Sequence, residues 1–408
     1  MRVSCGSGTL DCVGLLRAAI DASHSLDVEI RHDLHRHPEL GYAETRTSGV
    51  VRNHLESQKI DLCGNLAGGT GVLGYLPATT NPEGARTIAL RADMDALPIV
   101  EETGAEYQST NRGVMHACGH DGHTTILMAT ARALSQMPER PNNVLFVFQP
   151  AEEGGAGGDR MCKEGVLNGR LMGKTADVIY GLHGNPWIEL GHVSTRNGPL
   201  MASATELHIT ISGKGSHAAY PHLGIDPIVV ASHVITALQT IASRSVDPLD
   251  SVVVTIGKVE AGLAHNVIPE KAHLSGTVRT LQDSTFALVK SRIVEIVRNV
   301  AAAFGAQGEA EFLGSYPVTF NHTEPTDRFR EVARATLGSQ FVHEEAAPSM
   351  GAEDFSFYGR EVPACFYFLG LRSPEQTTYP NLHSPRFDFN DAAIPVGVEL
   401  MCELALNG

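Results

Sequence analysis

Three short apolar runs, each ending abruptly in acidic residues or a histidine, constrain the fold of this chain more than any other feature. They are "TIALRADMD", which ends in Asp93 and Asp95, "NVLFVFQPAEE", which ends in Glu152 and Glu153, and "ADVIYGLH", which ends in His183. Runs this continuous are typical of strands that are buried on both faces, as in a parallel sheet covered by helices. Open sheets of this kind bind ligands beyond the carboxyl ends of their strands. The runs therefore predict one shared site with metal-binding side chains.

The middle of the chain shows a different pattern. The stretch "ATELHITISGKG" alternates apolar and polar residues, as a half-buried antiparallel strand does. Helices are expected after Asp226 and after Asp283, and the strands "SVVVTIGKVEAG", "KAHLSGTVRTL" and "GEAEFLG" complete the order β-α-β-β-α-β of a ferredoxin-like unit. We therefore predict a domain at 200–313 that interrupts a catalytic α/β domain made of residues 1–199 and 314–408, because "PACFYFLGL" and a final helix resume the first pattern.

The stretch "MHACGHDGHTT" places one cysteine and three histidines within eleven residues. In an extended segment, residues i and i+2 point to the same side, so Cys118 and His120 could face one ion. Thiolate and imidazole groups suit zinc and its neighbours among the transition metals. The alternative is a helix N-terminus with a buried cysteine and solvated histidines, since a helix is expected after Gly122.

The paired acids Glu152 and Glu153 favour the metal hypothesis. They follow an apolar strand and precede "GGAGG", and buried carboxylates repel each other unless a cation or a proton separates them. Neighbouring side chains of an extended segment point opposite ways, so one glutamate could hold a metal while the other acts as a general base. The alternative is an exposed acidic turn.

Two further histidines and two aspartates complete the candidate site. A lone histidine is more often structural than a ligand, but His183 and His383 stand in turns rich in Gly, Pro and Asn, and His183 directly follows an apolar strand. Asp93 and Asp95 could orient ligands or water from behind the metal-binding side chains.

Charge and composition exclude several classes of partner. The net charge is −15, with no run of Lys or Arg, which argues against nucleic acid and anionic membrane surfaces. No stretch approaches the roughly 18 consecutive apolar residues of a membrane span. The N-terminus lacks the pattern of a signal peptide. The odd number of scattered cysteines, 7 in all, argues for a reducing compartment. A cytoplasmic protein with a small-molecule substrate is expected.

Taken in order, the motifs resemble the amidohydrolase branch of the dinuclear metallopeptidase family that also contains the aminoacylases and carboxypeptidase G. This branch holds N-acyl-amino-acid amidohydrolases, among them hippurate hydrolases and IAA-amino acid (indole-acetyl-amino-acid) hydrolases. The resemblance runs nearly end to end, through "RHDLHRHPELGYAE", "RADMDALP", "MHACGHDGHTT", "QPAEEGG", "GLH", "GKGSHAAYPHLGIDPI", "HNVIPEKAHLSGTVR", "MGAEDF" and "LHSPRFDFND". It implies a phosphorylase/hydrolase-like α/β catalytic domain with an inserted ferredoxin-like (βαββαβ) lid that mediates dimerisation.

The resemblance also implies roles for individual residues. Glu152 matches the general base, and Asp95 is expected to assist catalysis by orienting a ligand or the water. His217 is similar to a histidine that reaches into the active site of the neighbouring subunit. Asn266 and Arg279 match positions that hold the α-carboxylate of the substrate or the developing oxyanion. Two divalent metal ions (Mn, Zn, Co or Ni) are expected per subunit, on the ligands Cys118, His120, Glu153, His183 and His383.

The implied activity is metal-dependent hydrolysis of the amide bond of N-acyl-L-amino acids with hippurate-, N-acetyl- or indole-acetyl-like acyl groups, by a homodimer or higher homo-oligomer. One alternative is a dipeptidase or exopeptidase of the same clan, which would need an acidic partner for a free α-amine. Another is a non-catalytic metal-binding protein, but such a protein needs no base at Glu152. The segment "GLHGNPWIELG" departs from the usual text of this branch, and it is expected near the acyl side of the pocket.

Overall fold

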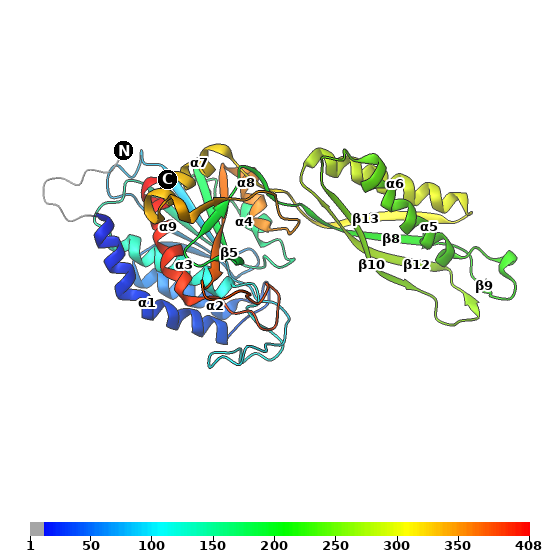
Figure 1. Ribbon diagram of the computed structural model, residues 1–408, viewed down its shortest axis with the longest axis horizontal. Helices are drawn as coiled ribbons and strands as arrows, with labels where there is room; N and C mark the ends of the chain where they lie inside the picture. The colour runs from blue at the N-terminus through cyan, green and yellow to red at the C-terminus, as the bar shows by residue number, and fades with distance from the viewer. Residues whose placement is uncertain (1–11) are drawn as a thin grey trace. The chain divides into compact units, whose positions relative to one another are not determined.

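The computed structural model describes residues 12–408, and the chain divides into two compact units (Figure 1). The large unit comprises Met1–Gly198 (described from residue 12), Phe320–Ala346 and Asp354–Gly408, and the small unit comprises Pro199–Thr319 and Ala347–Glu353. The small unit is larger than the insertion expected at 200–313, because it also contains residues 347–353. This segment belongs to the small unit because the amide of Ala202 donates to the carbonyls of Ser349 and Gly351, at 3.0 and 2.9 Å.

The large unit is built on an eight-stranded sheet with the order β1-β2-β4-β3-β5-β16-β6-β15. β3 pairs in parallel with β4 and β5, and β5 pairs in parallel with β16. Antiparallel pairs join β1 to β2, β2 to β4 and β16 to β6. The predicted parallel strands are therefore present, in a mixed sheet. The strands are β1 (Asp61–Leu66), β2 (Gly71–Leu76), β3 (Thr87–Asp93), β4 (Asn143–Gln149), β5 (Val178–Glu189), β6 (Val193–Thr195), β15 (Val342–Glu344) and β16 (Ala364–Arg372).

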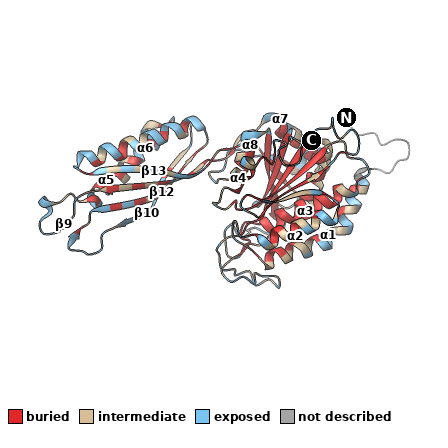
Figure 2. Cartoon of the chain, turned by 180° about the vertical axis from the view of Figure 1, so that it is seen from behind, coloured by how far each residue is buried: buried red, intermediate tan, exposed pale blue. Residues whose placement is uncertain are grey.

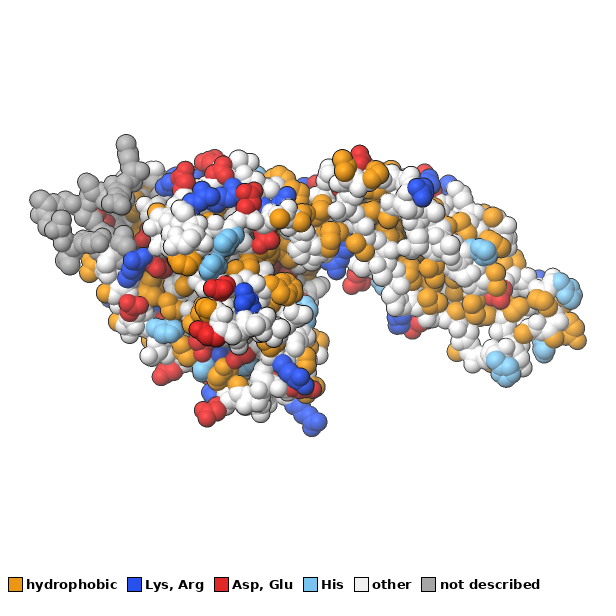
Figure 3. Space-filling model, in the orientation of Figure 1, with side chains coloured by type: hydrophobic (Ala, Val, Ile, Leu, Met, Phe, Trp, Pro, Cys, Tyr) orange, Lys and Arg blue, Asp and Glu red, His pale blue; other side chains and the backbone are white. Residues whose placement is uncertain are grey.

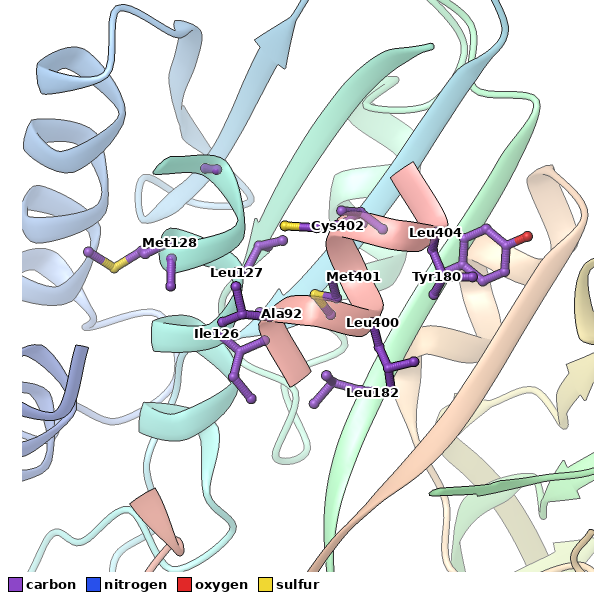
Figure 4. Close-up of a cluster of buried hydrophobic side chains, with 14 of the residues drawn as sticks. Ala92, Ile126, Leu127, Met128, Tyr180, Leu182, Leu400, Met401, Cys402 and Leu404 are labelled. Carbon is purple, nitrogen blue, oxygen red and sulfur yellow. The ribbon is translucent and has the colours of Figure 1, made fainter. Parts of the chain in front are cut away.

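Helical segments pack on both faces of this sheet. Tyr180 and Leu182 of β5 point toward α9 and α3, whereas a Cβ at Gly181 would lie 2.7 Å from the ring of Phe355 on the opposite face (Figure 4). Only glycine allows that close approach between strand and helix. The helices of the large unit are α1 (Cys12–Arg36), α2 (Thr45–Ser57), α3 (His120–Gln136), α4 (Gly157–Glu164), α7 (Thr323–Leu337), η3 (Ser339–Phe341), η4 (Asp354–Phe357), α8 (Tyr358–Glu361), η5 (Asp391–Ala393) and α9 (Ile394–Asn407).

The main core lies between β3, β5, α3 and α9. Figure 4 shows Ile126 and Leu127 of α3 near Leu400 and Met401 of α9, and these side chains are at most 1% exposed. Every residue of β3 and β4 is buried, and Figure 2 shows the same for most of the central sheet. Burying one such apolar side chain contributes about 1.5–3 kcal/mol, so this core holds the polar strand ends in fixed positions.

The small unit is a four-stranded antiparallel sheet, with the order β10-β12-β8-β13, and two helices pack on one of its faces (Figure 1). The predicted β-α-β-β-α-β order is the observed one. Leu207, Ile209 and Ile211 alternate along β8 and are buried under the helices, as the sequence pattern predicts. The elements are β8 (Ala204–Ser212), β9 (Ser216–His217), η1 (Pro221–Leu223), α5 (Pro227–Thr240), η2 (Ile241–Ser245), β10 (Val252–Ala261), β11 (Val267–Ile268), β12 (Lys271–Thr280), α6 (Asp283–Ala303) and β13 (Gln307–Tyr316).

The chain passes between the two units four times: in the short strands β7 (Gly198–Met201) and β14 (Thr319–Asn321), and at either end of the segment 347–353. The side chain of Asp226 caps α5 by accepting a hydrogen bond from the amide of Ile228 at 2.9 Å.

Within residues 12–408, no helix has both the length and the apolar character that crossing a bilayer requires.

Candidate metal centre

The predicted cysteine–histidine pair lies at the start of α3 and not on an extended segment. Gly119 has a φ of 86°, in the left-handed region that favours glycine, and His120 is the first residue of the helix. The expectation that strand alternation aligns Cys118 with His120 is therefore wrong. The left-handed turn at Gly119 brings the two side chains to the same place instead.

Candidate ligands gather at this turn in groups whose ligand atoms lie within 4.8 Å of one another. Two of the groups share Sγ of Cys118: Cys118 with His120 and His183, and Cys118 with Glu153 and His383. The five side chains that the sequence singles out as ligands thus meet within the large unit. Two groups joined by one thiolate are the arrangement that two neighbouring ions would need.

The two glutamates after β4 both belong to this cluster. Glu152, Glu153 and His120 form a further group of ligand atoms within 4.8 Å of one another. Glu152 is buried, and its Oε1 accepts a hydrogen bond from the amide of Asp354 at 3.3 Å. The simple picture of two carboxylates on opposite sides of an extended strand does not hold, because the chain turns at Glu153.

The ring of His120 indicates most clearly that a cation fits the site. His120 is 0% exposed, and its Nδ1 donates to Asp95, with 2.9 Å to the carbonyl oxygen and 3.2 Å to Oδ1. Its Nε2 has no hydrogen-bond partner among residues 12–408. A buried polar atom without a partner is costly unless a ligand completes it. Asp95 also accepts from the amide of Glu153 at 2.9 Å, so it orients two of the candidate ligands.

The electrostatics of the cluster lead to the same interpretation. Burial, with the charges of Glu153 and Glu152, raises the pKa of the Cys118 thiol well above its usual range. Burial disfavours a charged ring at His120, but Asp93 and Asp95 outweigh it and raise the pKa to about 10. The chain alone thus balances its carboxylates with protons. Divalent cations would replace those protons and stabilise the thiolate.

His183 lies inside β5, so its expected position in a turn is wrong. The strand continues to Glu189 because β16 keeps pairing with it, with His183 opposite Phe368. Its Nδ1 donates to the carbonyl of Gly184 at 2.8 Å, and its Nε2 lies 3.4 Å from Sγ of Cys118. Burial lowers the pKa of His183 to about 3, so the ring is in the neutral form that binds metals.

His383 does lie in a turn, on the more open side of the cluster. Its side chain is 54% exposed, and its Nε2 is 3.2 Å from Oε1 of Glu153. The amide of His383 donates to the carbonyl of Ala117 at 2.8 Å, which ties this turn to the residue before Cys118. His383 has a φ of 63°, a strained value for a side chain of this size, and such strain often accompanies function.

A third histidine supports the cluster, and the sequence analysis did not assign it a role. His123 is buried, its Nδ1 donates to Oδ1 of Asp93 at 2.7 Å, and its Nε2 accepts from the amide of Gly184 at 2.9 Å. Both nitrogens are therefore engaged, and His123 positions the segment that carries His183. The sequence spacing could have indicated this role, because His123 stands three residues after His120 and therefore shares its helix face.

The same support extends to the other side of the cluster through Arg91. Its Nη1 donates to Oδ2 of Asp93 at 2.7 Å, and its Nη2 donates to Oδ1 of Asp354 at 3.0 Å. Asp354 also accepts from the amide of Gly158 at 2.8 Å, which fixes the start of α4, the helix that follows Glu153. All of these side chains are buried. The sequence contains Asp354 in "MGAEDF", but only the fold shows that Arg91 reaches it.

The remaining predicted residues belong to the small unit. His217, on β9, and Asn266 are exposed neighbours, because the amide of Ala218 donates to the carbonyl of Asn266 at 3.0 Å. Arg279 lies on β12 on the sheet face away from the helices, since its neighbours Val278 and Thr280 are buried beneath them. It is half-buried and forms no ion pair within the described part of the chain.

The chain is similar to known proteins over most of its length. Residues 89–407 match the family model of peptidase family M20/M25/M40. IAA-amino acid hydrolase ILR1-like 5 from Arabidopsis thaliana is 40% identical over 383 residues, covering 93% of this chain and 85% of the relative. N-acetylcysteine deacetylase from Bacillus subtilis (strain 168) is 38% identical over 386 residues, covering 94% of this chain and 97% of the relative.

Among solved structures, the Bacillus subtilis YXEP protein has the same fold. It is described as a dinuclear metal binding peptidase from the M20 family. It is 35% identical, with a TM-score of 0.80, and the alignment covers 95% of this chain and 98% of that one.

Proposed function

Because the chain belongs to peptidase family M20/M25/M40, we propose that it hydrolyses the amide bond of N-acyl-L-amino acids in a metal-dependent reaction. The products would be a carboxylic acid and a free amino acid. One observation carries the proposal: Glu152 lies beside His120 but belongs to neither of the two groups that share Cys118. A site that only stored metal would not need this additional carboxylate.

The five candidate ligands would hold two divalent ions, for which Mn, Zn, Co and Ni are all compatible with the donors. They offer one thiolate, three imidazoles and one carboxylate, and Nε2 of His120, which makes no hydrogen bond within residues 12–408, belongs to this group. When bound, such a pair polarises the amide carbonyl and lowers the pKa of water toward 7. The ligands are Cys118, His120, Glu153, His183 and His383.

The reaction itself would use the carboxylate of Glu152. As a general base it takes a proton from the attacking water, and it then delivers that proton to the nitrogen of the leaving amine. The amide of Asp354 holds Oε1 of Glu152 at 3.3 Å, so the carboxylate is oriented before substrate binds. Asp95 holds His120 and the backbone of Glu153 in place and would serve as a positioning residue.

The small unit would supply the groups that recognise the rest of the substrate. Arg279, which has no ion-pair partner within residues 12–408, would bind the α-carboxylate, because a guanidinium binds a carboxylate through two parallel hydrogen bonds. Asn266 would assist it, and His217 would donate a hydrogen bond to the oxyanion as negative charge develops. Such a carboxylate site allows an acidic protein to select an anionic substrate.

We also propose that two copies of the chain associate through the small unit. Exposed apolar side chains lie around β9, η1 and the turn before β11, and Figure 3 shows hydrophobic side chains on the surface of this unit. An apolar cluster of this kind is typical of an interaction surface. His217 stands within it, with its ring centroid 5.5 Å from that of Tyr220, and we propose that it reaches the site of a second copy docked here. The exposed residues are Tyr220, Leu223, Ile228, Leu263 and Val267.

A cytoplasmic location is part of the proposal. The described cysteines Cys63, Cys118, Cys162, Cys365 and Cys402 are all free thiols. Unpaired cysteines are typical of a reducing compartment, and Cys118 must stay reduced to serve as a ligand.

Activity should be measured on N-acetyl, N-benzoyl and indole-acetyl amino acids after reconstitution with Mn, Zn, Co or Ni. Glu152→Gln should lower kcat by about 10²–10⁴-fold while the bound metal, measured by mass spectrometry, is retained. The matched control is Glu56→Gln, at an exposed position on α2, which should leave both unchanged.

Two results would contradict the proposal. One is full activity in Glu152→Gln. The other is hydrolysis of dipeptides with a free α-amine in preference to every N-acyl amino acid, which would favour a dipeptidase or exopeptidase.

A further inference from the structure

The single tryptophan of the chain stands exposed beside the candidate metal centre. Trp187 is 65% exposed and lies on β5, four residues after His183, in the segment "GLHGNPWIELG". An isolated exposed apolar side chain needs no functional explanation. The way in which this one is held does call for one.

Hydrogen bonds fix Trp187 within its own segment, which carries His183, and join it to the turn that carries His383. Its indole Nε1 donates to Oδ1 of Asn381 at 3.1 Å, and its backbone amide donates to Oδ1 of Asn185 at 2.9 Å. Asn185 stands two residues after His183. Asn381 stands two residues before His383 and accepts from the amide of Ser384 at 3.1 Å, which closes the turn around His383.

The ring is therefore fixed in place while much of its surface is open to solvent. Fixing an exposed side chain costs conformational entropy, and Trp187 belongs to neither of the apolar cores formed by the described residues 12–408. A ligand that covers the ring would gain from this fixed position, because the entropy has already been lost before binding.

We propose that Trp187 forms one wall of the acyl-group subsite and that it favours planar aromatic acyl groups over acetyl. The inference rests on the proposed function, because it takes the scissile carbonyl to bind at the candidate metal centre. The acyl group is joined to that carbonyl by one bond, so a group larger than acetyl must extend beyond the ligands. His183 and His383 form part of that boundary, and the indole joins their segments. An aromatic ring placed there can stack on the indole, whereas a methyl group offers little surface to it.

Two other roles would leave Trp187 without a part in specificity. The indole could only brace the two ligand-bearing segments, in which case its removal should affect all substrates alike. It could instead be covered by a second copy of the chain, in which case its removal should change the oligomeric state. The experiment separates these outcomes.

The kinetic test compares N-benzoyl and N-acetyl derivatives of one amino acid. Trp187→Ala should lower the ratio of kcat/KM for benzoyl over acetyl by about tenfold, the size of effect expected when an aromatic contact is lost. Trp187→Phe keeps a ring but not the indole N–H, and should retain most of the ratio. Leu26→Ala, which removes an exposed apolar side chain from α1, should leave the ratio unchanged.

A binding test uses the same tryptophan as its own reporter, since the chain has no other. Titration of the metal-loaded wild-type protein with benzoate should change the intrinsic fluorescence, and acetate should not. This readout does not depend on turnover. If wild type hydrolyses no N-acyl amino acid, the proposed function fails, and so does the acyl-subsite inference that rests on it. If hydrolysis occurs and benzoate leaves the fluorescence unchanged, only the role of Trp187 fails.

Three further outcomes overturn the inference while leaving the proposed function intact. They are equal losses for both substrates in Trp187→Ala, a lower metal content in that variant, and a changed molecular mass in solution by light scattering. The first two would assign Trp187 to bracing, and the third would assign it to a subunit contact.

Discussion

In the large unit, the polar side chains at the strand ends are buried and paired with one another, whereas in the small unit the polar side chains expected to contact substrate face outward. His120, Asp93 and Arg91 are 0% exposed, Arg91 donates a hydrogen bond to Asp93, and Nε2 of His120 lies 3.8 Å from Oδ2 of Asp93. His217 and Asn266 are exposed, and Arg279 has no ion pair within residues 12–408. One set is organised by the fold itself. In the proposed function, the other set would act on a molecule outside its unit, a substrate or a second chain.

The difference follows from the cost of burying charge. An ionised group in the interior must be paired, or its desolvation destabilises the fold. In the large unit, networks of ion pairs and hydrogen bonds provide this pairing. One such network joins α1 to the start of α3. There Arg31 Nη1 lies 3.2 Å from Oδ2 of Asp121, and Nδ1 of His35 lies 2.8 Å from the same oxygen. Asp121 directly follows His120, so this network also holds a candidate ligand in place.

The largest effect should come from removing the side chain that both ligand groups share. Cys118→Ala should lose most of the bound metal and nearly all activity, falling to the level of the chelated wild-type protein. Cys63→Ala, at a free cysteine on β1, is the matched control and should keep both. Metal content and kcat measured on the same preparations decide the point. Full activity in metal-stripped protein would contradict the proposal that the buried side chains of the large unit hold a catalytic metal.

A smaller loss should follow from removing the cation of the small unit. Arg279→Ala should lower kcat/KM for an N-acyl amino acid by roughly thirtyfold or more, as expected for about 2–5 kcal/mol of lost transition-state binding. The same variant should lose little further activity on the substrate whose α-carboxylate is replaced by an amide. Arg298→Ala, at an exposed position on α6, is the control. If wild type hydrolyses acid and amide equally well, Arg279 does not bind the carboxylate.

The buried network of the large unit should respond to pH. Burial disfavours a charged ring at His35, but Asp121 and Glu101 outweigh it and raise the pKa from 6.5 to about 9. A raised pKa stabilises the fold below pH 6.5, and this stabilisation disappears as the pH rises through about 9. The full shift corresponds to roughly 3 kcal/mol.

Chemical denaturation of wild type and His35→Gln checks this expectation. The variant should be less stable than wild type at pH 6, and the difference should shrink as the pH rises past the pKa of His35. His37→Gln, at a more exposed position two residues further along, should change the free energy of unfolding little. A difference that grows with pH would have the wrong sign and would exclude a charged His35 in the folded state.

The smallest signal should come from mixing two inactive proteins. His217→Ala and Glu152→Gln subunits, combined as heterodimers, should recover a fraction of wild-type activity, because one hybrid site receives an intact His217 and an intact Glu152. This result would show that the outward-facing side chains of the small unit act on a second chain. No recovery in heterodimers verified by mass spectrometry would confine each site to one chain.

Much of the fold could be predicted from the sequence, because its strongest signals are periodic. The continuous apolar runs of β3 and β4 gave buried strands, and the alternation along β8 gave a half-buried one. Both patterns depend only on what each residue buries. The segment 347–353 carries no such signal. It joins the small unit through backbone hydrogen bonds that residue types do not reveal.

The candidate site could be predicted in its membership but not in its geometry. The turn at Gly119 requires a left-handed backbone conformation, which the residues "ACGHD" do not predict. The extension of β5 past His183 depends on pairing with β16, which is distant in sequence. The hydrogen bonds of His123 and Arg91 likewise join residues that only the tertiary fold brings together. Metal binding by the gathered side chains stays a prediction.

The place of β16 in the sheet sets the order in which the protein can be completed during synthesis. β16 lies between β5 and β6, yet the ribosome makes it only after the 199–319 segment of the small unit. Domains tend to fold as units while the chain emerges, so the small unit can form while the central sheet still lacks an inner strand. His383 follows β16 and emerges later still. Chains that have not yet reached His383 therefore cannot assemble the full set of candidate ligands, and they would lack the proposed hydrolytic activity.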